Sequence, residues 1–314
     1  MPVVSVVLIF LNEERFLEEA VRSVCDQTWV DWELILVDDG STDRSTQIAR
    51  ELACRDVRIC YLEHPGHENR GMAASRNLGV ANTTAPYIAF IDGDDVWVPT
   101  KLAEQVDLLE RMPDVAMVNG ALLYWHSWDP AATEEDETIL TAGVADRRID
   151  PPEAALTTYP LGDADGAGVD LLIRRSVFDA VRGFEERFRG IYEDQSFLLK
   201  VFLRYPIYMS SREWLLYRQH EASACAQTSR AGYVAARGVF LDWLKDDVER
   251  LGDPRVSAAL RRARQQNRYE KLYEPISDRF RRFRSWMLAT CKDPVKRCVR
   301  LARRYGTGNG GIPS

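Results

Sequence analysis

Three carboxylates at residues 92, 94 and 95 have the residue types and the spacing that binding of a metal ion requires. Asp92 and Asp94 are separated only by Gly93, so the chain can bend between them and direct two hard oxygen donors at one cation. The same residues are also typical of an acidic turn that caps the helix expected from Thr100 to Arg111. Considered by themselves, the aspartates leave both interpretations open.

The apolar run that precedes these aspartates has the length of a buried strand. Three earlier runs are similar, and each is followed by residues with helical spacing. This alternation of strands and helices predicts a doubly wound, mostly parallel sheet with flanking helices, in which ligands bind beyond the carboxyl ends of the strands. The predicted strands are residues 3–10, 32–37, 58–63 and 87–91, and the predicted helices are residues 14–25, 44–54 and 72–81.

A second acidic pair, Asp38 and Asp39, follows the predicted strand 32–37 and is expected to face the same crevice as Asp92 and Asp94. An acidic crevice requires a cation. No Gly-x-Gly-x-x-Gly or P-loop sequence follows any of the predicted strands, so the usual dinucleotide and P-loop sites are not supported. These features favour a nucleotide that is held by carboxylates and a divalent metal.

The composition is that of an ordinary globular protein, because the 314-residue chain is 46% hydrophobic and 28% charged. Its six cysteines show no Cys-x-x-Cys pair and no zinc-ligand spacing, which favours free thiols in a reducing compartment. The apolar run at residues 3–11 is too short to span a bilayer and lacks the flanking features of a signal peptide. We therefore expect a cytoplasmic protein.

Positive charge is concentrated near the carboxyl terminus. Residues 255–304 contain 16 Lys or Arg and 4 Asp or Glu, although the formal net charge of the whole chain is −7. No nucleic-acid-binding motif accompanies this charge, so a nucleic acid partner is not expected. Three interpretations remain open: a peripheral contact with the anionic inner face of a membrane, a contact with an acidic partner, and a solvated helical face.

Five segments carry a resemblance to a known family: Val4–Leu8, Asn12–Glu14, Trp32–Asp43, Ala74–Gly79 and Phe90–Asp95. In this order they resemble the successive sequence blocks of the family 2 glycosyltransferases. The order makes the match specific, where each block alone would be weak. The resemblance implies the GT-A fold, which is Rossmann-like, and an inverting transfer of a sugar from a nucleotide-sugar donor.

The resemblance also implies roles for individual residues in binding the donor. Asp39 matches the aspartate that contacts the nucleobase, and Arg76 matches an arginine near the nucleotide. Asp92 and Asp94 match the DXD motif, which holds the ribose and the metal. The other donor-site positions are Ile9, Leu11, Glu13 and Gly93.

One departure from the family pattern precedes Asn12. Many members have a proline before an aromatic-Asn pair, where this chain has Ile9-Phe10-Leu11-Asn12. The departure concerns the details of the contact with the base and does not concern the fold.

Two later segments resemble the blocks that supply catalytic and metal-binding groups. Glu193 and Asp194 resemble the Glu-Asp block with the catalytic base, which we assign to Asp194 with Glu193 as support or second candidate. Two carboxylates at a helix amino terminus are also favoured by the helix dipole, so capping is the alternative. His220 resembles the late histidine that completes a metal shell with Asp94 and Asp92, and this set suits Mn²⁺ or Mg²⁺.

The chain is expected to have three parts. Residues 1–225 form the GT-A catalytic domain, with a nucleotide-binding half at 1–112 and an acceptor-side half at 113–225. Residues 226–305 have helical spacing and form a basic carboxyl-terminal extension. Residues 306–314 are expected to be a disordered tail.

The segment from His126 to Thr158 contains prolines and carboxylates and shows little periodicity. This composition predicts a long irregular segment or a lid over the site. Trp125 and Trp128 flank its start, and we interpret them as core residues in preference to a platform for a sugar ring.

Together these features predict a metal-dependent inverting glycosyltransferase that moves a sugar, with UDP as the favoured nucleotide, to a hydroxyl of a glycan, lipid-linked or other acceptor. One alternative is a sugar-phosphate nucleotidylyltransferase, which would need a Gly-rich basic loop where this chain has Asn12-Glu13-Glu14. Another is a non-catalytic scaffold that binds a membrane or a partner through its basic helices. The sequence leaves the donor sugar, the acceptor and the oligomeric state open.

Overall fold

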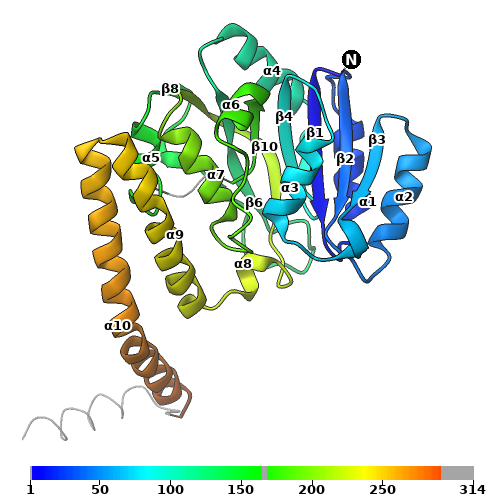
Figure 1. Ribbon diagram of the computed structural model, residues 1–314. Helices are drawn as coiled ribbons and strands as arrows, with labels where there is room; N and C mark the ends of the chain where they lie inside the picture. Colours follow the sequence, from blue (N-terminus) through cyan, green and yellow to red (C-terminus); the bar gives the residue numbers. More distant parts are fainter. Residues whose placement is uncertain (1, 165–167, 291–314) are drawn as a thin grey trace, which may run out of the picture. The chain divides into compact units, whose positions relative to one another are not determined.

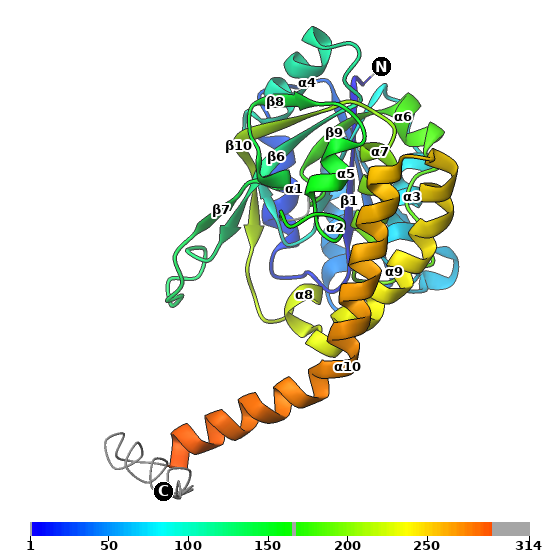
Figure 2. The ribbon, with the colours of Figure 1, turned by 90° about the vertical axis from the view of Figure 1, so that its left-hand side faces the viewer.

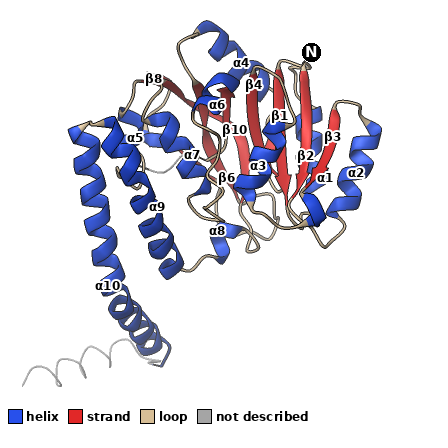
Figure 3. Ribbon diagram, viewed as in Figure 1, coloured by secondary structure: helices blue, strands red, loops and turns tan. Residues whose placement is uncertain are grey.

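The structure is a computed structural model that describes residues 2–164 and 168–290. A central sheet lies between helices (Figures 1 and 3). The strands lie in the order β3-β2-β1-β4-β9-β6-β10-β5, with β7 paired to β6 and β8 paired to β10. The strands are β1 (Val4–Phe10), β2 (Trp32–Asp38), β3 (Ile59–Glu63), β4 (Tyr87–Asp92), β5 (Val96–Trp97), β6 (Met117–Trp125), β7 (Glu137–Ile139), β8 (Arg147–Ile149), β9 (Leu171–Arg174) and β10 (Ile207–Arg218).

Helices lie on both faces of this sheet, and Figure 1 shows α3, α6 and α7 in front of it. Two short 3₁₀ turns, Pro65–His67 and Thr141–Gly143, join other elements. The helices are α1 (Leu17–Cys25), α2 (Ser45–Arg55), α3 (Met72–Ala81), α4 (Lys101–Arg111), α5 (Glu153–Thr157), α6 (Arg175–Ala180), α7 (Glu193–Phe202), α8 (Ala224–Gln227), α9 (Arg230–Leu251) and α10 (Pro254–Thr290).

The predicted parallel unit is confirmed. β1 runs parallel to both β2 and β4, and β2 runs parallel to β3. Phe10 pairs in register with Asp38, and Ile9 pairs with Asp92. The carboxyl ends of β1, β2 and β4 therefore align, and the turns after them share one edge of the sheet.

The second half of the sheet contains a reversal that the sequence did not indicate. β9 is antiparallel to both β4 and β6, whereas β10 is parallel to β6. As a result, β6 and β10 run in the same direction as β4. The carboxyl end of β10 consequently lies at the same edge as Asp92, so the residues that follow β10 can reach the predicted site.

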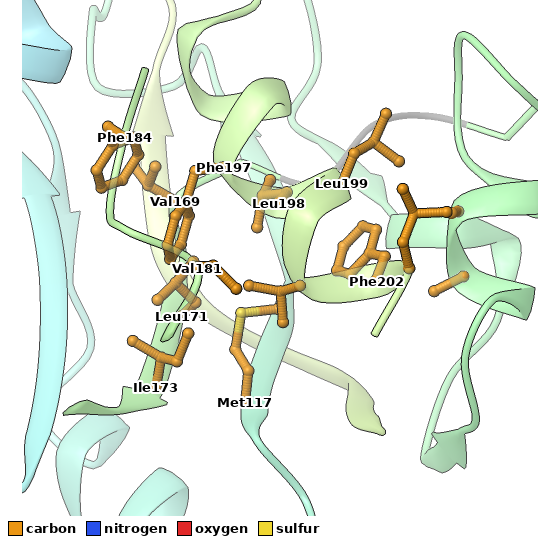
Figure 4. Close-up of a cluster of buried hydrophobic side chains, with 14 of the residues drawn as sticks. Met117, Val169, Leu171, Ile173, Val181, Phe184, Phe197, Leu198, Leu199 and Phe202 are labelled. Atoms are coloured by element: carbon orange, nitrogen blue, oxygen red, sulfur yellow. The ribbon is translucent and has the colours of Figure 1, made fainter. Parts of the chain in front are cut away.

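Two apolar clusters hold the helices against the sheet. Alternate residues of β1 point to opposite faces: Val7 and Ile9 join the cluster that packs against α3, α6 and α7, whereas Leu8 and Phe10 join the cluster under α1 and α4. Figure 4 shows part of the first cluster, with Met117 of β6, Leu171 and Ile173 of β9, and Phe197, Leu198, Leu199 and Phe202 of α7. Burial of this apolar surface is the main force that holds these layers together.

The helical extension predicted after residue 225 is present in the described residues, but its first part belongs to the catalytic body. The first compact unit runs from Met1 to Gln265, and residues 266–314 form a second unit. Apolar residues of α9 and early α10 are buried in the same cluster as the sheet, and they are Val234, Phe240, Leu241, Leu244, Val248, Val256, Ala259, Leu260 and Ala263. The predicted disordered tail, 306–314, lies outside the described residues.

Two local expectations need correction. The helix expected from residue 14 begins at Leu17, because Asn12 takes a left-handed conformation (φ 59°) and its Oδ1 accepts hydrogen bonds from the backbone of Thr42 (2.7 Å) and Asp43 (3.3 Å). The segment 126–158 is also less irregular than expected. It contains α5 and two short strands, and Figure 2 shows β7 completing a hairpin with the end of β6.

Within the part of the chain that the structure describes, we find no helix with both the length and the apolar character that crossing a bilayer requires.

Candidate functional site

Asp39 lies just beyond β2, where backbone amides hold its carboxylate. Its Oδ1 accepts hydrogen bonds from the amides of Arg70 (2.7 Å) and Gly71 (3.0 Å). The loops can approach this closely because Gly40 has no side chain, and a Cβ there would lie 2.8 Å from the amide nitrogen of Asn69. Asp38 instead closes its own turn, since its Oδ1 accepts from the amide of Ser41 (2.8 Å). Asp39 itself is only 4% exposed, and its contact with a nucleobase stays a prediction.

Asp94 and His220 come together from distant parts of the chain. Asp94 follows β4, His220 follows β10, and the Oδ2 of Asp94 lies 2.9 Å from the Nε2 of His220. Both side chains are mostly buried, with exposed fractions of 17% and 10%. The carboxylate and the imidazole therefore form a preorganised pair at the edge where the strands end.

The turn between Asp92 and Asp94 depends on Gly93. A Cβ at this position would lie 2.7 Å from the Cβ of Phe10 and 3.3 Å from the Cγ of Glu13. Any other residue would therefore push the turn away from β1. The same contact places the Glu13 side chain against the turn, and its role in the donor site stays a prediction.

Negative charge accumulates around this turn. Burial, followed by the neighbouring charges of Asp94 and Asp92, raises the pKa of Glu13 to about 8. Burial also raises the pKa of Asp92 and of Asp95, and in both cases the charge of Asp94 adds to the effect. Such a cluster favours a bound cation. Across residues 2–164 and 168–290, however, no three His, Cys, Asp or Glu side chains are arranged to hold a metal ion by themselves.

Arg76 of α3 bridges two carboxylates in the interior. Its Nη2 donates to Asp92 Oδ1 (2.6 Å), and its Nη1 donates to Glu193 Oε1, while the residue is only 1% exposed. The sequence places Arg76 near the nucleotide, and in the structure these two guanidinium nitrogens are already paired. Arg76 thus connects the end of β4 with the start of α7.

Glu193 and Asp194 form the first turn of α7. Burial raises the pKa of Glu193 to about 7. The positive charge of Arg76 opposes this shift, and the negative charge of Asp194 adds to it. Burial also raises the pKa of Asp194, which senses the charges of both Arg76 and Asp92. Asp194 Oδ1 accepts a hydrogen bond from the amide of Gln195 (2.7 Å), but the N-cap residue of α7 is Tyr192, which makes no side-chain capping bond. Both carboxylates lie in the first turn of α7, where the helix dipole favours negative charge, so this alternative and proximity to the acidic turn coexist.

The two remaining donor-site positions lie at the end of β1. Ile9 is 4% exposed and its side chain belongs to the apolar core, so only its backbone faces the site edge. Leu11 is 39% exposed beyond the strand. The structure therefore gathers Glu13, Asp92, Gly93, Asp94 and His220 in one group, and Arg76, Asp92, Glu193 and Asp194 in an adjoining one.

The family model described as glycosyl transferase family 2 matches residues 5–182, which is more than half of the chain. The chain belongs to this family. The sequence blocks predicted this membership, and the chain spans less than half the length of several curated relatives that it matches.

Curated relatives of this glycosyltransferase include two from Bacillus subtilis. It is 31% identical to the putative glycosyltransferase EpsE over 222 residues, which cover 64% of this chain and 73% of EpsE. It is 40% identical to the putative teichuronic acid biosynthesis glycosyltransferase TuaG over 113 residues, 35% of this chain and 43% of TuaG. The match to the glycosyltransferase GlyA of Streptococcus pneumoniae spans only 16% of that protein.

Solved structures confirm that the glycosyltransferase has the GT-A fold. Residues 1–349 of TarS from S. aureus, in complex with UDP-GlcNAc, superpose with a TM-score of 0.63 at 16% identity, covering 87% of this chain and 73% of that one. The mannosyltransferase PcManGT from Pyrobaculum calidifontis, in complex with GDP-Man and Mn²⁺, gives a TM-score of 0.56 at 16% identity. That match covers 96% of this chain and 80% of PcManGT. At this identity, the likeness concerns the fold.

Two residues of the glycosyltransferase matter more than their sequence context indicated. Asn12 connects the turn after β1 to the loop after β2 through its side-chain oxygen. Arg218 donates hydrogen bonds to Asp94 and Asp95 of the acidic turn. Asn12 could have been found from its position in the Asn12-Glu13-Glu14 block, whereas the contacts of Arg218 have no local sequence signal.

Removal of the buried guanidinium in Arg76→Gln should lower the free energy of unfolding by about 3–5 kcal/mol, because the carboxylates of Asp92 and Glu193 lose their partner. Urea denaturation followed by circular dichroism measures this loss. Arg175→Gln is the matched control, since Arg175 donates to neutral oxygens of Ala85 (2.6 Å) and Thr83 (2.6 Å). An equal loss in both variants would contradict the bridging role.

The loss in free energy of unfolding caused by Arg76→Gln should also depend on pH. In the folded protein the pKa of Glu193 is about 7, above its ordinary 4.5, so the stability that depends on Glu193 falls as pH rises between these values. Without Arg76, which lowers this pKa, the fall continues to higher pH. The variant should therefore be closer to the wild type at pH 6 than at pH 8.

Proposed function

We propose that this glycosyltransferase moves a sugar from a nucleotide-sugar donor, with UDP as the favoured nucleotide, to an acceptor hydroxyl with inversion of the anomeric centre and with the help of a divalent metal. The observation that carries the proposal is the gathering, at one edge of the sheet, of Asp39, the Asp92–Asp94 turn, His220 and the start of α7. These groups derive from segments that are far apart in the sequence, as a composite ligand site requires.

Two kinds of observation support the donor assignment. The carboxylate of Asp39 is held by two backbone amides at the end of β2, which is where an α/β sheet of this kind binds nucleotides. In addition, TarS was solved with UDP and with UDP-GlcNAc, and PcManGT was solved with GDP-Man. The TarS complexes with UDP and with UDP-GlcNAc are consistent with UDP as the favoured nucleotide.

The residues around Asp94 fit a divalent ion. A carboxylate oxygen and an imidazole nitrogen already lie 2.9 Å apart, and these are donor types that suit Mn²⁺, with Mg²⁺ as the alternative. We propose Asp94 and His220 as the protein ligands, with Asp92 beside them, and a substrate diphosphate would complete the shell. When bound, the ion would neutralise the charge of the leaving diphosphate. The complex of PcManGT with Mn²⁺ is consistent with this proposal.

The protein side chains would divide the remaining tasks. Asp194 would accept the proton of the acceptor hydroxyl while that oxygen attacks the anomeric carbon of the sugar. The attack would come from the face opposite the leaving nucleotide, which inverts the anomeric centre. Arg76 would keep Asp92 and the start of α7 at a constant separation, because it donates to both Asp92 and Glu193.

A panel of UDP-, GDP- and dTDP-sugars, assayed for nucleotide release with and without a chelator, tests this function. We expect release from a UDP-sugar that stops with EDTA and returns with Mn²⁺. Release that continues undiminished in EDTA would contradict the metal requirement, and preferential release from a GDP-sugar would contradict the choice of nucleotide.

The same preparation distinguishes the two alternatives. Pyrophosphate release from UTP and a sugar phosphate would instead indicate a nucleotidylyltransferase. The absence of both turnover and metal-dependent nucleotide binding would indicate a scaffold.

The acceptor is proposed to be a hydroxyl of a glycan, a lipid-linked sugar or another glycoconjugate. The name of TuaG, which links that relative to teichuronic acid biosynthesis, supports a role in polysaccharide biosynthesis. The basic residues of 255–304 would suit a peripheral contact with the anionic inner face of a membrane, and we propose that the reaction takes place on the cytoplasmic side.

A further inference from the structure

Arg218, the last residue of β10, makes a set of contacts that the proposed reaction does not use. Its Nε donates to the carbonyl oxygen of Asp94 (2.7 Å), and its backbone amide donates to Asp95 Oδ1 (3.0 Å). A third bond runs from Nη2 to Glu19 Oε2 (2.6 Å). One residue therefore ties the end of β10 to two successive residues of the acidic turn and to α1.

Three aromatic rings surround the guanidinium of Arg218. Its Cζ lies 4.5 Å from the ring centre of Phe16, 4.5 Å from that of Trp125 and 5.0 Å from that of Trp128. The residue is only 3% exposed. Aromatic faces stabilise a cation and leave the planar group few alternative rotamers, so the hydrogen bonds to the turn are held in one direction.

The position of Arg218 in the chain connects its contacts with the proposed donor site. His220 lies two residues further along the chain, and its Nε2 contacts the side chain of Asp94, the residue whose carbonyl accepts from Arg218. The ring of His220 also packs against Phe16, with 5.3 Å between ring centres. Phe16 thus contacts both the guanidinium and the imidazole, so displacement of Arg218 would release both sides of the Asp94–His220 pair.

We propose that Arg218 is a positioning residue that sets the distance between Asp94 and His220 by fixing the backbone of the acidic turn against the end of β10. The role deepens the proposed function, because it concerns the same pair of side chains. It differs from a contribution to stability alone, since it predicts a change in the local environment of His220 within the folded protein. Partners that orient metal ligands in this way typically affect metal affinity by roughly 10–100-fold.

Two substitutions of Arg218 distinguish the effect of its charge from the effect of its hydrogen bonds. Arg218→Lys keeps a positive charge near the rings but replaces the planar fork, whose Nε and Nη2 reach Asp94 and Glu19 in fixed directions, with one ammonium nitrogen that cannot hold both bonds in this geometry. Arg218→Met fills the aromatic cage without any donor. Arg174→Lys is the matched control: Arg174 also donates to backbone carbonyls, those of Val115 (2.8 Å) and Leu109 (2.7 Å), but at the opposite edge of the sheet.

The first readout is the imidazole ¹⁵N spectrum of the free protein. The chain has four histidines, and His220→Gln identifies the signal of His220. We expect this signal to shift in both Arg218 variants and to stay in place in Arg174→Lys. The second readout is the affinity for Mn²⁺ in the presence of UDP, measured by calorimetry, which should weaken at least about tenfold in Arg218→Met.

The outcomes separate the two proposals. If both Arg218 variants only lower the melting temperature, as Arg174→Lys does, and leave the His220 signal and Mn²⁺ affinity unchanged, the positioning role is overturned. If the wild type does not bind Mn²⁺ with UDP while the His220 signal still shifts in the variants, the proposed function fails and the positioning role stands.

Discussion

Asp194→Asn should lower kcat by about 10²–10⁴-fold while donor binding is retained, because the substitution removes a general base and leaves the shape of the side chain unchanged. The hydrogen bond from the amide of Gln195 to the side-chain oxygen can persist in the variant, so the start of α7 should keep its conformation. Sugar transfer is measured with saturating donor, and UDP affinity is measured by calorimetry in the presence of Mn²⁺.

Glu193→Gln is the appropriate comparison for this experiment. Glu193 is buried and bonded to Arg76, so its substitution should affect stability more than the chemical step. If Glu193→Gln abolishes transfer while Asp194→Asn stays active, the base is Glu193 and our assignment is wrong.

The pH dependence of the same reaction gives a further check on the base. Burial raises the pKa of Asp194 above its ordinary value of 3.8, and a base must be unprotonated to work. The value of kcat/KM should therefore fall on the acid side, with an inflection above pH 3.8. This limb should be absent from the residual activity of Asp194→Asn.

Asp94→Asn should lower kcat/KM by about 10³-fold or more, because the loss of the carboxylate weakens a contribution of several kcal/mol to stabilisation of the leaving group. The amide is isosteric, so the turn after β4 should persist. The measurement is donor turnover as a function of Mn²⁺ concentration, in which Asp94→Asn should need more metal as well as being slower. His220→Gln should raise the metal requirement in the same direction.

Asp146→Asn serves as the control for Asp94→Asn. Asp146 is also a carboxylate that accepts hydrogen bonds from its neighbours, here the hydroxyl (2.6 Å) and the amide (3.0 Å) of Ser211 in β10. It has no role in the proposed site, so its substitution should leave the Mn²⁺ dependence unchanged. A fully active Asp94→Asn enzyme with normal Mn²⁺ dependence would contradict the proposal that Asp94 is a metal ligand.

The fold of residues 1–112 was predictable because its signals are local. Strands buried on both faces read as continuous apolar runs, and the helices between them show 3.6-residue periodicity. β1, β2, β3 and β4 were accordingly found close to their true bounds, and α3 was found over Met72–Ala81. The parallel order by itself predicted that Asp39 and the Asp92–Asp94 turn lie at the same edge of the sheet.

The fold of residues 113–225 was less predictable because its contacts are long-range. Nothing in the four residues of β9 indicates that it inserts antiparallel between β4 and β6. Short strands such as β7 and β8 carry too few residues for a periodic signal, so the segment 126–158 was interpreted as irregular. The proposed division of the catalytic domain at residue 112 stays a prediction.

By itself, the sequence determined the family, the GT-A fold and the set of side chains available for chemistry, since these depend on residue types at fixed local spacings. Only the tertiary structure decided which of those side chains contact one another. It paired Arg76 with Asp92 and Glu193, brought His220 to Asp94, and enclosed Arg218 beside the acidic turn. Each contact joins residues more than a dozen positions apart, so it follows from strand order and burial and has no signature in the neighbouring sequence.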